Sequence, residues 1–432
     1  MKKYDITVIG GGAAGITAAL TSKGFKKKVL IIEKRKMGGE CTHYGCVPSK
    51  ALIKAAHDKL ENPLEYVKGK IEEVYSEETD DVFRSKGIDV IIGEAEFINS
   101  KVIKVNGEEI ESKKFIVATG GENRVPNIYG IEDIDYLTNE NIFYLDKLPE
   151  KISMIGGGPI TVELGQALKK LGVNITIYLR GSDLINKEEK IIRDRLKSIL
   201  ISEGIEIIEN AKIDRIDDTY LYMGEDKKEY GSLFISIGRE KNIKILDKLN
   251  IKKYNKGIIL NNKLQTSLKN IYLAGDVAGP YGLSHMAEYQ GIIAGFNASV
   301  PLINRKVDNN KRIWSIFTSP EISHLGLTEE EAKSKYSKVY TYEIEYSDID
   351  RAKVETQQGI VKVILDKKYK ILGAHIIGER AGELIHELAV IKELGVPITK
   401  LSDIIHVYPT YSDILKKLGR KVLIDKYRRL IK

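Results

Sequence analysis

Residues 4–25, YDITVIGGGAAGITAALTSKGF, predict the fold of the N-terminal part of the chain. A buried parallel strand is followed by a helix, and Gly10, Gly12 and Gly15 lie between them with the spacing GxGxxG. Glycines there let the backbone approach a pyrophosphate, while the helix N-terminus supplies amide groups and a favourable dipole. The next strand, KKVLIIE, ends at Glu33, where a carboxylate can accept hydrogen bonds from a ribose. We therefore predict a dinucleotide site in an α/β fold, with a glycine-rich turn of an unrelated α/β protein as the alternative.

The pattern recurs in residues 151–181, KISMIGGGPITVELGQALKKLGVNITIYLRG. Gly156 and Gly158 occupy the first two glycine positions, and Thr161 replaces the third. Arg180 stands where the first unit has its acid, and an arginine without a carboxylate favours the 2′-phosphate of NADPH over NADH. A surface arginine without a ligand is the alternative. Two dinucleotide sites in one chain predict a donor and an acceptor that exchange electrons.

The only two cysteines, Cys41 and Cys46, lie in GGECTHYGCVPSK, residues 38–50. Two cysteines cannot form a disulfide framework for a chain of 432 residues, and two thiols alone make a poor zinc site. A helix that begins near the second cysteine, together with Lys50, would stabilise a thiolate and lower its pKa. The segment predicts a redox or nucleophilic role, against the alternative of two buried structural cysteines.

Composition narrows the class of protein. The 432 residues predict two to four domains, and 42% hydrophobic with 30% charged residues is typical of a globular protein. The net charge of +7 comes from interspersed charges, which favours a solvated lysine-rich surface over nucleic-acid binding. No apolar run approaches the roughly 18–20 residues of a membrane span, and the N-terminus reads as a buried strand, so we expect a cytoplasmic protein.

Two further patterns, in the C-terminal tail and in the spacing of the histidines, support weaker predictions. The tail from residue 415 has basic and apolar residues at helical spacing, which predicts a dimer-packing helix more strongly than peripheral contact with an anionic membrane. The histidines are scattered and lack the spacing of metal ligands, so we predict no metal site.

Along nearly its whole length the sequence resembles the flavin-dependent pyridine nucleotide-disulfide oxidoreductases, in the branch of dihydrolipoamide dehydrogenase, glutathione reductase and mercuric reductase-like proteins. Both glycine units and the cysteine segment carry the resemblance. So do FIVATGG (115–121), SIGREKN (236–242), NIYLAGDVAG (270–279) and FTSPEISHLGLTEEEA (317–332).

The resemblance implies two Rossmann-like nucleotide-binding domains, for FAD and NAD(P), and a C-terminal α+β dimerisation domain. We expect the first part of the FAD domain in residues 1–148, the NAD(P) domain in 149–255, a return to the FAD domain in 256–310 and the interface domain in 311–432. In that last segment, residues 359–378 alternate as two strands around a turn, and 381–395 are helical.

The resemblance also implies roles for individual residues. Cys46 would lie next to the flavin, Cys41 would be the thiol that attacks an acceptor, and Lys50 would pair with Glu163 near the flavin. The positions implied for FAD are Gly10, Gly12, Gly15, Glu33, Gly39, Lys50, Thr119, Gly120, Asp276 and His285. Those implied for the nicotinamide cofactor are Gly156, Gly158, Arg180 and Gly238.

The C-terminal segment HVYPTYSD, residues 406–413, departs from the family pattern His-x-His-Pro-Thr-x-Ser-Glu. His406 matches the first histidine, Tyr408 stands at the position of the catalytic acid-base, and Asp413 replaces the orienting glutamate. A phenol with a pKa near 10 is a poor general base at neutral pH. Efficient turnover of lipoamide or glutathione disulfide is therefore not implied, and a tyrosine packed at a subunit interface is the alternative.

We predict a homodimeric FAD enzyme that passes electrons from NADPH or NADH, with NADPH favoured, through flavin and the Cys41–Cys46 disulfide to a disulfide-like acceptor, as in dihydrolipoamide dehydrogenase. No cysteine follows Cys46, so the C-terminal cysteine pair of the usual mercuric reductases is absent. The alternatives are an NAD(P)H oxidase or quinone reductase of the same fold, and a redox-sensing flavoprotein whose partners read the dithiol state.

Overall fold

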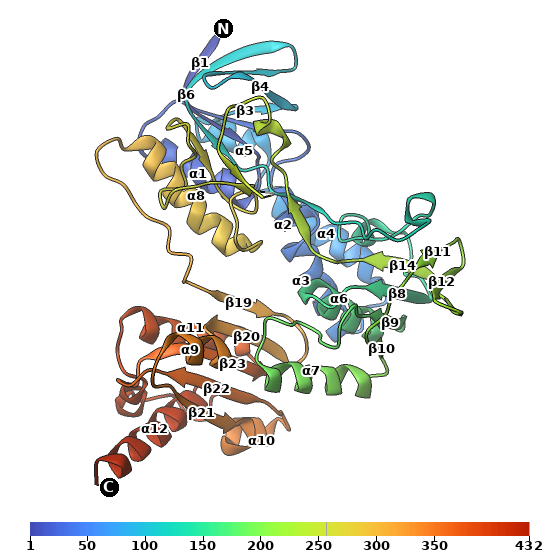
Figure 1. Ribbon diagram of the computed structural model, residues 1–432, viewed down its shortest axis with the longest axis vertical. Helices are drawn as coiled ribbons and strands as arrows, with labels where there is room; N and C mark the ends of the chain where they lie inside the picture. The colour runs from blue at the N-terminus through green and yellow to red at the C-terminus, as the bar shows by residue number, and fades with distance from the viewer. Residues whose placement is uncertain (256, 432) are drawn as a thin grey trace. The chain divides into compact units, whose positions relative to one another are not determined.

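The computed structural model describes residues 1–255 and 257–431, which form two compact units (Figure 1). The first unit combines Met1–Pro149 with Phe234–Asn309, and the second combines Glu150–Leu233 with the chain from Asn310 onwards. The four domain segments expected from the sequence stay predictions. Residue 256, where the third segment begins, and residue 432, where the fourth ends, lie outside the described residues.

A largely parallel sheet forms the core of the first unit. Its strand order is β3-β2-β1-β6-β5-β4, and β18 pairs with β6 in parallel. The strands are β1 (Lys2–Ile9), β2 (Val29–Glu33), β3 (Asp89–Ile92), β4 (Ala95–Asn99), β5 (Val102–Val105), β6 (Glu108–Val117) and β18 (Ile271–Leu273). Their apolar side chains are buried because layers cover both faces, as expected for a parallel sheet.

Two helices far apart in sequence, α1 (Ala13–Gly24) and α8 (Ser284–Ser299), pack against each other on this sheet (Figure 1). Glycines allow their close approach: a Cβ on Gly291 would lie 2.5 Å from the carbonyl oxygen of Ala14, and one on Gly295 would lie 2.6 Å from that of Ala18. The packing places the start of α8 beside the glycine loop that precedes α1.

The remaining elements of the first unit include the two helices of the cysteine segment. The helices are α2 (Gly39–His43), α3 (Cys46–His57), α4 (Pro63–Tyr75) and α5 (Asp80–Ser85), with 3-10 turns at Ile131–Asp133, Ile142–Tyr144 and Lys244–Leu246. Two short antiparallel pairs complete it: β7 (Gly121–Asn123) with β15 (Arg239–Lys241), and β16 (Lys253–Tyr254) with β17 (Gly257–Ile258).

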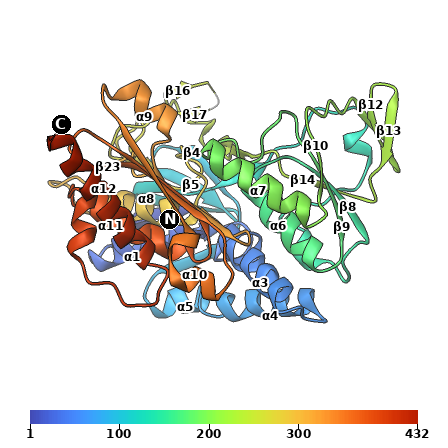
Figure 2. The same ribbon diagram turned by 90° about the horizontal axis from the view of Figure 1, so that it is seen from below.

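The second unit begins with another parallel sheet of order β10-β9-β8-β14. Its strands are β8 (Lys151–Ile155), β9 (Asn174–Tyr178), β10 (Glu206–Ile208) and β14 (Ser232–Ile235). Figure 2 shows α6 (Pro159–Lys170) and α7 (Lys190–Ser202) next to these strands. A small antiparallel sheet follows, made of β11 (Arg215–Ile216), β12 (Tyr220–Met223) and β13 (Asp226–Glu229).

A five-stranded antiparallel sheet of order β19-β20-β23-β22-β21 forms the C-terminal part of the second unit. Its strands are β19 (Ile313–Ile316), β20 (Glu321–Gly326), β21 (Tyr340–Glu345), β22 (Ile360–Leu365) and β23 (Ile371–Gly378). The helices are α9 (Glu329–Lys335), α10 (Asp350–Val354), α11 (Ala381–Glu393) and α12 (Asp413–Ile431), with 3-10 turns at Tyr346–Asp348 and Ile398–Asp403. The predicted strand pair, the helix after it and the α/β fold class with a C-terminal α+β domain are confirmed.

The basic tail is helical and joins the core of its own domain along its first half. Leu415, Leu418 and Val422 of α12 are buried, and a Cβ on Gly419 would lie 2.8 Å from the Cβ of Leu401. Within residues 1–255 and 257–431, none of the helices has the length and apolarity that crossing a membrane requires.

Two helical glycines provide a matched test of the packing around the first glycine loop. In Gly15→Ala, the new Cβ in α1 would lie within the van der Waals radius of the carbonyl oxygen of Gly10. We expect a loss of about 1–3 kcal/mol in the free energy of unfolding, because the backbone must shift.

The control is Gly69→Ala, at an exposed position of α4, where the new Cβ meets nothing within 4 Å. That variant should gain about 0.5–1 kcal/mol. Urea unfolding measures both, and equal effects would contradict this account.

Candidate functional site

The cysteine segment lies directly against the first glycine loop. The Gly38 N–H donates to the Gly11 carbonyl at 2.8 Å, and a Cβ on Gly39 would lie only 2.6 Å from the Cα of Gly12. Gly38 and Gly39 have φ values of 93° and 62°, which a residue with a side chain adopts only with strain. Side chains are thus absent where the two segments cross. Cys41 in α2 follows this crossing by two residues, and Cys46 begins the next helix, α3.

The two cysteines have different surroundings. Cys41 in α2 is half-buried, whereas Cys46 at the start of α3 is exposed, and its Sγ lies 3.2 Å from the Ser284 hydroxyl. The pKa of Cys41 is raised, because its thiol donates a hydrogen bond to Cys46 and because it is buried near that sulfur's charge. When the pair carries one negative charge, the proton therefore stays on Cys41. Ser284, at the N-terminus of α8, is a contact that the sequence alone did not single out.

A carboxylate next to Cys41 belongs to a polar cluster of the first unit. Glu40 is paired with Arg239 and accepts a hydrogen bond from the Asn139 amide at 3.1 Å. Arg239 also donates to the Gly121 carbonyl at 2.5 Å and lies 3.5 Å from Asp276. Burial raises the pKa of Glu40 to about 7, with Arg239 opposing the shift and Asp276 adding to it. Glu40 lies within the cysteine segment quoted above. Its partner Arg239 lies some 200 residues away in the sequence, so the segment alone could not predict the ion pair.

The first loop has the features expected of a dinucleotide site. Gly12 caps α1 without a side-chain hydrogen bond, so the N-terminal amides of the helix have no side-chain cap. Gly10 has φ 111°, and a Cβ there would overlap the Ala118 carbonyl. Glu33 at the end of β2 accepts the Gly11 N–H at 2.6 Å and the Arg35 N–H at 2.8 Å, which fixes its carboxylate beside the loop.

The other positions implied for FAD come from several elements of the same unit. Thr119 and Gly120 follow β6, and the Thr119 hydroxyl donates to the Asn242 carbonyl at 2.7 Å. Asp276 follows β18, and burial raises its pKa. His285 is exposed in the first turn of α8, and the Lys50 ammonium lies 3.4 Å from the Ser49 hydroxyl in α3.

The second glycine loop repeats this geometry in the second unit. Gly156 has φ 129°, and Gly158 caps α6 without a side-chain hydrogen bond and with no atom within 4 Å of its Cβ position. Thr161 is fully buried in the first turn of α6, so the helix accommodates a threonine at the third position. Arg180 is exposed directly after β9. Gly238, the fourth position implied for the nicotinamide cofactor, belongs to the first unit and has φ 104°.

Glu163 is buried in α6, and its Oε1 accepts the Phe317 N–H at 2.9 Å. This contact joins the second glycine unit to the C-terminal domain within the second unit. The pairing of Glu163 with Lys50 stays a prediction.

The C-terminal residues have carboxylate partners other than those expected from the motif. Nε2 of His406 lies 2.9 Å from the carboxylate oxygen Oε1 of Glu387 in α11, and its Nδ1 lies 3.1 Å from the Ile404 carbonyl. The exposed Tyr408 donates to Asp350 of α10 at 3.0 Å, and this hydrogen bond raises the pKa of the phenol.

Asp413, by contrast, lies at the start of α12 and pairs with Lys417 one turn on, at 3.6 Å. The carboxylates that contact the two candidate acid-base groups are therefore Glu387 and Asp350. Both are far in sequence from residues 406–413, which is why the motif does not reveal them.

Comparison with known proteins agrees with this geometry. Residues 4–291 match the family described as pyridine nucleotide-disulphide oxidoreductase, and residues 313–418 match its dimerisation domain. A mercuric reductase from Lysinibacillus sphaericus is 32% identical, over 96% of this chain and 81% of its own. A dihydrolipoyl dehydrogenase from Mycoplasma pneumoniae is 28% identical, over 98% and 100%. The structure of a Cu(II) complex of RclA, an HOCl-induced flavoprotein disulfide reductase from Escherichia coli, has a TM-score of 0.92 at 26% identity, over 98% and 100%.

The raised pKa of Glu40 predicts a pH-dependent stability. The folded protein keeps a proton that the unfolded chain releases between the ordinary pKa of 4.5 and about 7, so stability falls as the pH rises through this window. Glu40→Gln cannot lose that proton. We expect its Tm to rise relative to wild type from pH 5 to pH 8, by about 2–4 °C for each kcal/mol.

Glu61→Gln, at an exposed acid of the same unit, is the control and should show no such trend. A constant difference between Glu40→Gln and wild type across this pH range would contradict the prediction.

Proposed function

Because the chain belongs to the pyridine nucleotide-disulphide oxidoreductase family, whose members are FAD-dependent oxidoreductases acting on sulfur groups, we propose that it reduces a disulfide-like acceptor through Cys41 and Cys46. The observation that carries the proposal is the hydrogen-bonded thiol pair against the first glycine loop, with one thiol half-buried and the other exposed. The mercuric reductases, dihydrolipoyl dehydrogenases and RclA found as relatives support this class of reaction.

The residues of the first loop fit FAD. The side-chain-free crossing at Gly12 and Gly39 and the uncapped start of α1 offer backbone N–H groups to a pyrophosphate, and Glu33 is positioned for a ribose. FAD, when bound, would supply two-electron transfer between a nicotinamide and a disulfide. In the second unit, Gly156 and Gly158 would hold the nicotinamide cofactor. The exposed Arg180 would meet a 2′-phosphate, which favours NADPH over NADH.

The resemblance to the family assigns the attack on the acceptor to Cys41, and because the proton of the thiol pair stays on Cys41, that attack requires a base. In the reduced protein, the Cys41 sulfur attacks one sulfur of the acceptor disulfide, which forms a mixed disulfide and releases the other acceptor sulfur as a thiol. Cys46 then attacks Cys41, which forms the Cys41–Cys46 disulfide and releases the second acceptor thiol. Two thiol protons pass to the two leaving sulfurs, so the step balances.

An acid-base group is needed to move those protons. We propose His406 for this role, because one imidazole nitrogen can accept a proton while the other donates one, and because the ring is held by Glu387. Tyr408 keeps its proton, because Asp350 raises the pKa of its phenol, and it would act as a hydrogen-bond donor. Since residues 313–418 match a dimerisation domain, we propose that the enzyme works as a homodimer.

Reoxidation of the reduced protein tests the thiol pathway. The flavin-loaded protein is reduced anaerobically with NADPH or NADH and mixed with lipoamide, glutathione disulfide or a soluble quinone. We expect a disulfide to reoxidise wild type, and Cys41→Ser to slow that step by at least about 100-fold, because the attacking nucleophile is lost.

The outcome that would overturn this proposal is reoxidation by quinone alone, at equal rates in wild type and Cys41→Ser. That result would favour the oxidase or quinone reductase alternative, which none of the relatives named above supports. Slow reoxidation by every acceptor would favour a redox-sensing role.

The two C-terminal candidates can be separated by substitution. His406→Gln should lower disulfide turnover by about 10²–10⁴-fold, because the proton-transfer group is lost. Tyr408→Phe, which removes only the phenol oxygen, should cost less than about tenfold. The measurement is kcat/KM for the disulfide from pH 5.5 to 9, and the reverse ranking of the two variants would assign the acid-base role to Tyr408.

A further inference from the structure

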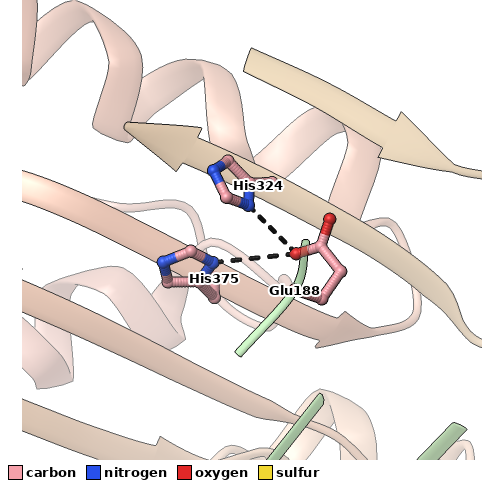
Figure 3. A group of neighbouring side chains, drawn as sticks. All are labelled: Glu188, His324 and His375. Carbon is pink, nitrogen blue, oxygen red and sulfur yellow. Dashed lines mark hydrogen bonds and ion pairs between the residues drawn. The ribbon is translucent and has the colours of Figure 1, made fainter. Parts of the chain in front are cut away.

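Three buried side chains that have no part in the proposed reaction meet within the second unit. Glu188 precedes α7, His324 lies on β20 and His375 lies on β23, and the two histidines are direct partners in the antiparallel ladder (Figure 3). The exposed fraction of each side chain is 1% or less. One ligand atom from each residue lies within 4.8 Å of those of the other two.

Both imidazoles are held in the same way. The Nε2 of His324 lies 3.0 Å from the Gly326 carbonyl, and the Nε2 of His375 lies 3.1 Å from the Leu327 carbonyl. A carbonyl only accepts, so each Nε2 carries a hydrogen and each Nδ1 is directed towards Glu188. This is the arrangement of metal-binding histidines, whose second nitrogen commonly donates to a backbone carbonyl.

Both Nδ1 atoms face the same carboxylate oxygen. Oε2 of Glu188 lies 3.0 Å from Nδ1 of His324 and 3.8 Å from Nδ1 of His375, as the dashed lines in Figure 3 show. Nδ1 of His375 is buried and has no hydrogen-bond partner. The other oxygen, Oε1, accepts the Trp314 indole N–H at 2.5 Å, and the Trp314 ring stacks on His324 with ring centroids 3.6 Å apart.

Hydrogen bonds alone leave one atom of this cluster unsatisfied. Nδ1 of His324 lies within hydrogen-bonding distance of Oε2 of Glu188, whereas Nδ1 of His375 is 3.8 Å from the same oxygen and has no hydrogen-bond partner. Because the hydrogen of the His375 ring is on Nε2, its Nδ1 directs a lone pair towards a carboxylate oxygen, which is also an acceptor.

A metal ion would satisfy all three atoms. Zinc binds histidine nitrogen and carboxylate oxygen at about 2.0–2.2 Å, which places neighbouring ligands of a tetrahedral site about 3.4 Å apart. The two nitrogen–oxygen separations of 3.0 and 3.8 Å lie on either side of that value. The geometry points to a binding site for a divalent transition-metal ion of the Zn²⁺ type, formed by Nδ1 of His324, Nδ1 of His375 and Oε2 of Glu188.

Glu188 also lines a pocket of about 630 Å³, whose lining combines acidic side chains such as Glu189 and Glu329 with basic ones such as Lys362. The Lys362 ammonium is already shared by Glu189 at 2.9 Å and Glu329 at 2.7 Å, so it does not neutralise Glu188. A bound ion would tie the segment before α7 to two strands of the C-terminal sheet, and would stabilise the folded second unit by mass action.

Zinc binding by the full-length, flavin-loaded protein tests the site. The measurement is made in a Cys41→Ser/Cys46→Ser background, so that the thiol pair cannot bind the ion. After treatment with a chelator, equilibrium dialysis against Zn²⁺ should give one ion per chain. His375→Gln should weaken binding by at least about tenfold. Loss of a residue that only orients a metal ligand already lowers metal affinity by about 10–100-fold, and this variant removes a ligand itself. The control His57→Gln, at an exposed histidine that contacts Asp58, should leave binding unchanged.

Binding below one ion per chain, or equal binding in His375→Gln and the background protein, would overturn the proposal. X-ray absorption of the zinc-loaded background protein provides a readout that does not depend on folding of the variant. Two imidazole nitrogens and a carboxylate oxygen are expected, and a spectrum without imidazole would overturn the site. Because the background lacks both thiols, neither result depends on the proposed reductase activity.

Discussion

The crossing of two backbones without side chains determines where the chemistry of this protein lies. Gly12 and Gly39 approach so closely that any Cβ on Gly39 would collide with the other chain segment. The same contact leaves the start of α1 open to a phosphate and brings α2, with Cys41, to the edge of the loop. Nucleotide binding and thiol chemistry are thus coupled by one steric constraint, and the surrounding helices keep it in place.

Local patterns predicted most of the fold, and the reason is physical. A buried strand, a glycine turn and a helix are specified by residues adjacent in sequence, so both glycine units, the cysteine helix and the final strand pair could be identified from residue spacing. The resemblance to a family then supplied the order of the domains. The limits of the domains were harder to predict, because each compact unit is formed by two separate segments of the chain.

The partners of the site residues could not be predicted, because they depend on tertiary contacts. Tyr408 contacts Asp350, His406 contacts Glu387, and Glu40 pairs with Arg239; in no case does the partner lie in the motif that singled out the residue. The expectation that Asp413 orients the acid-base group followed from position in a motif, whereas the structure pairs Asp413 with Lys417. The histidines on β20 and β23 appeared scattered for the same reason, since only the register of the sheet makes them neighbours.

The packing of α8 on α1 also has a consequence for synthesis of the chain. The first unit cannot close until β18 and α8 have left the ribosome. β6 emerges about 160 residues before β18, and α1 about 270 residues before α8; at 5–20 residues per second, these separations correspond to delays of roughly 8–32 s and 14–54 s. During that interval the last three residues of β6, 115–117, lack their neighbour on one edge, and the small-residue face of α1 is uncovered. Such surfaces aggregate or recruit chaperones. Production of the protein in a foreign host should therefore be governed by how that nascent edge is protected.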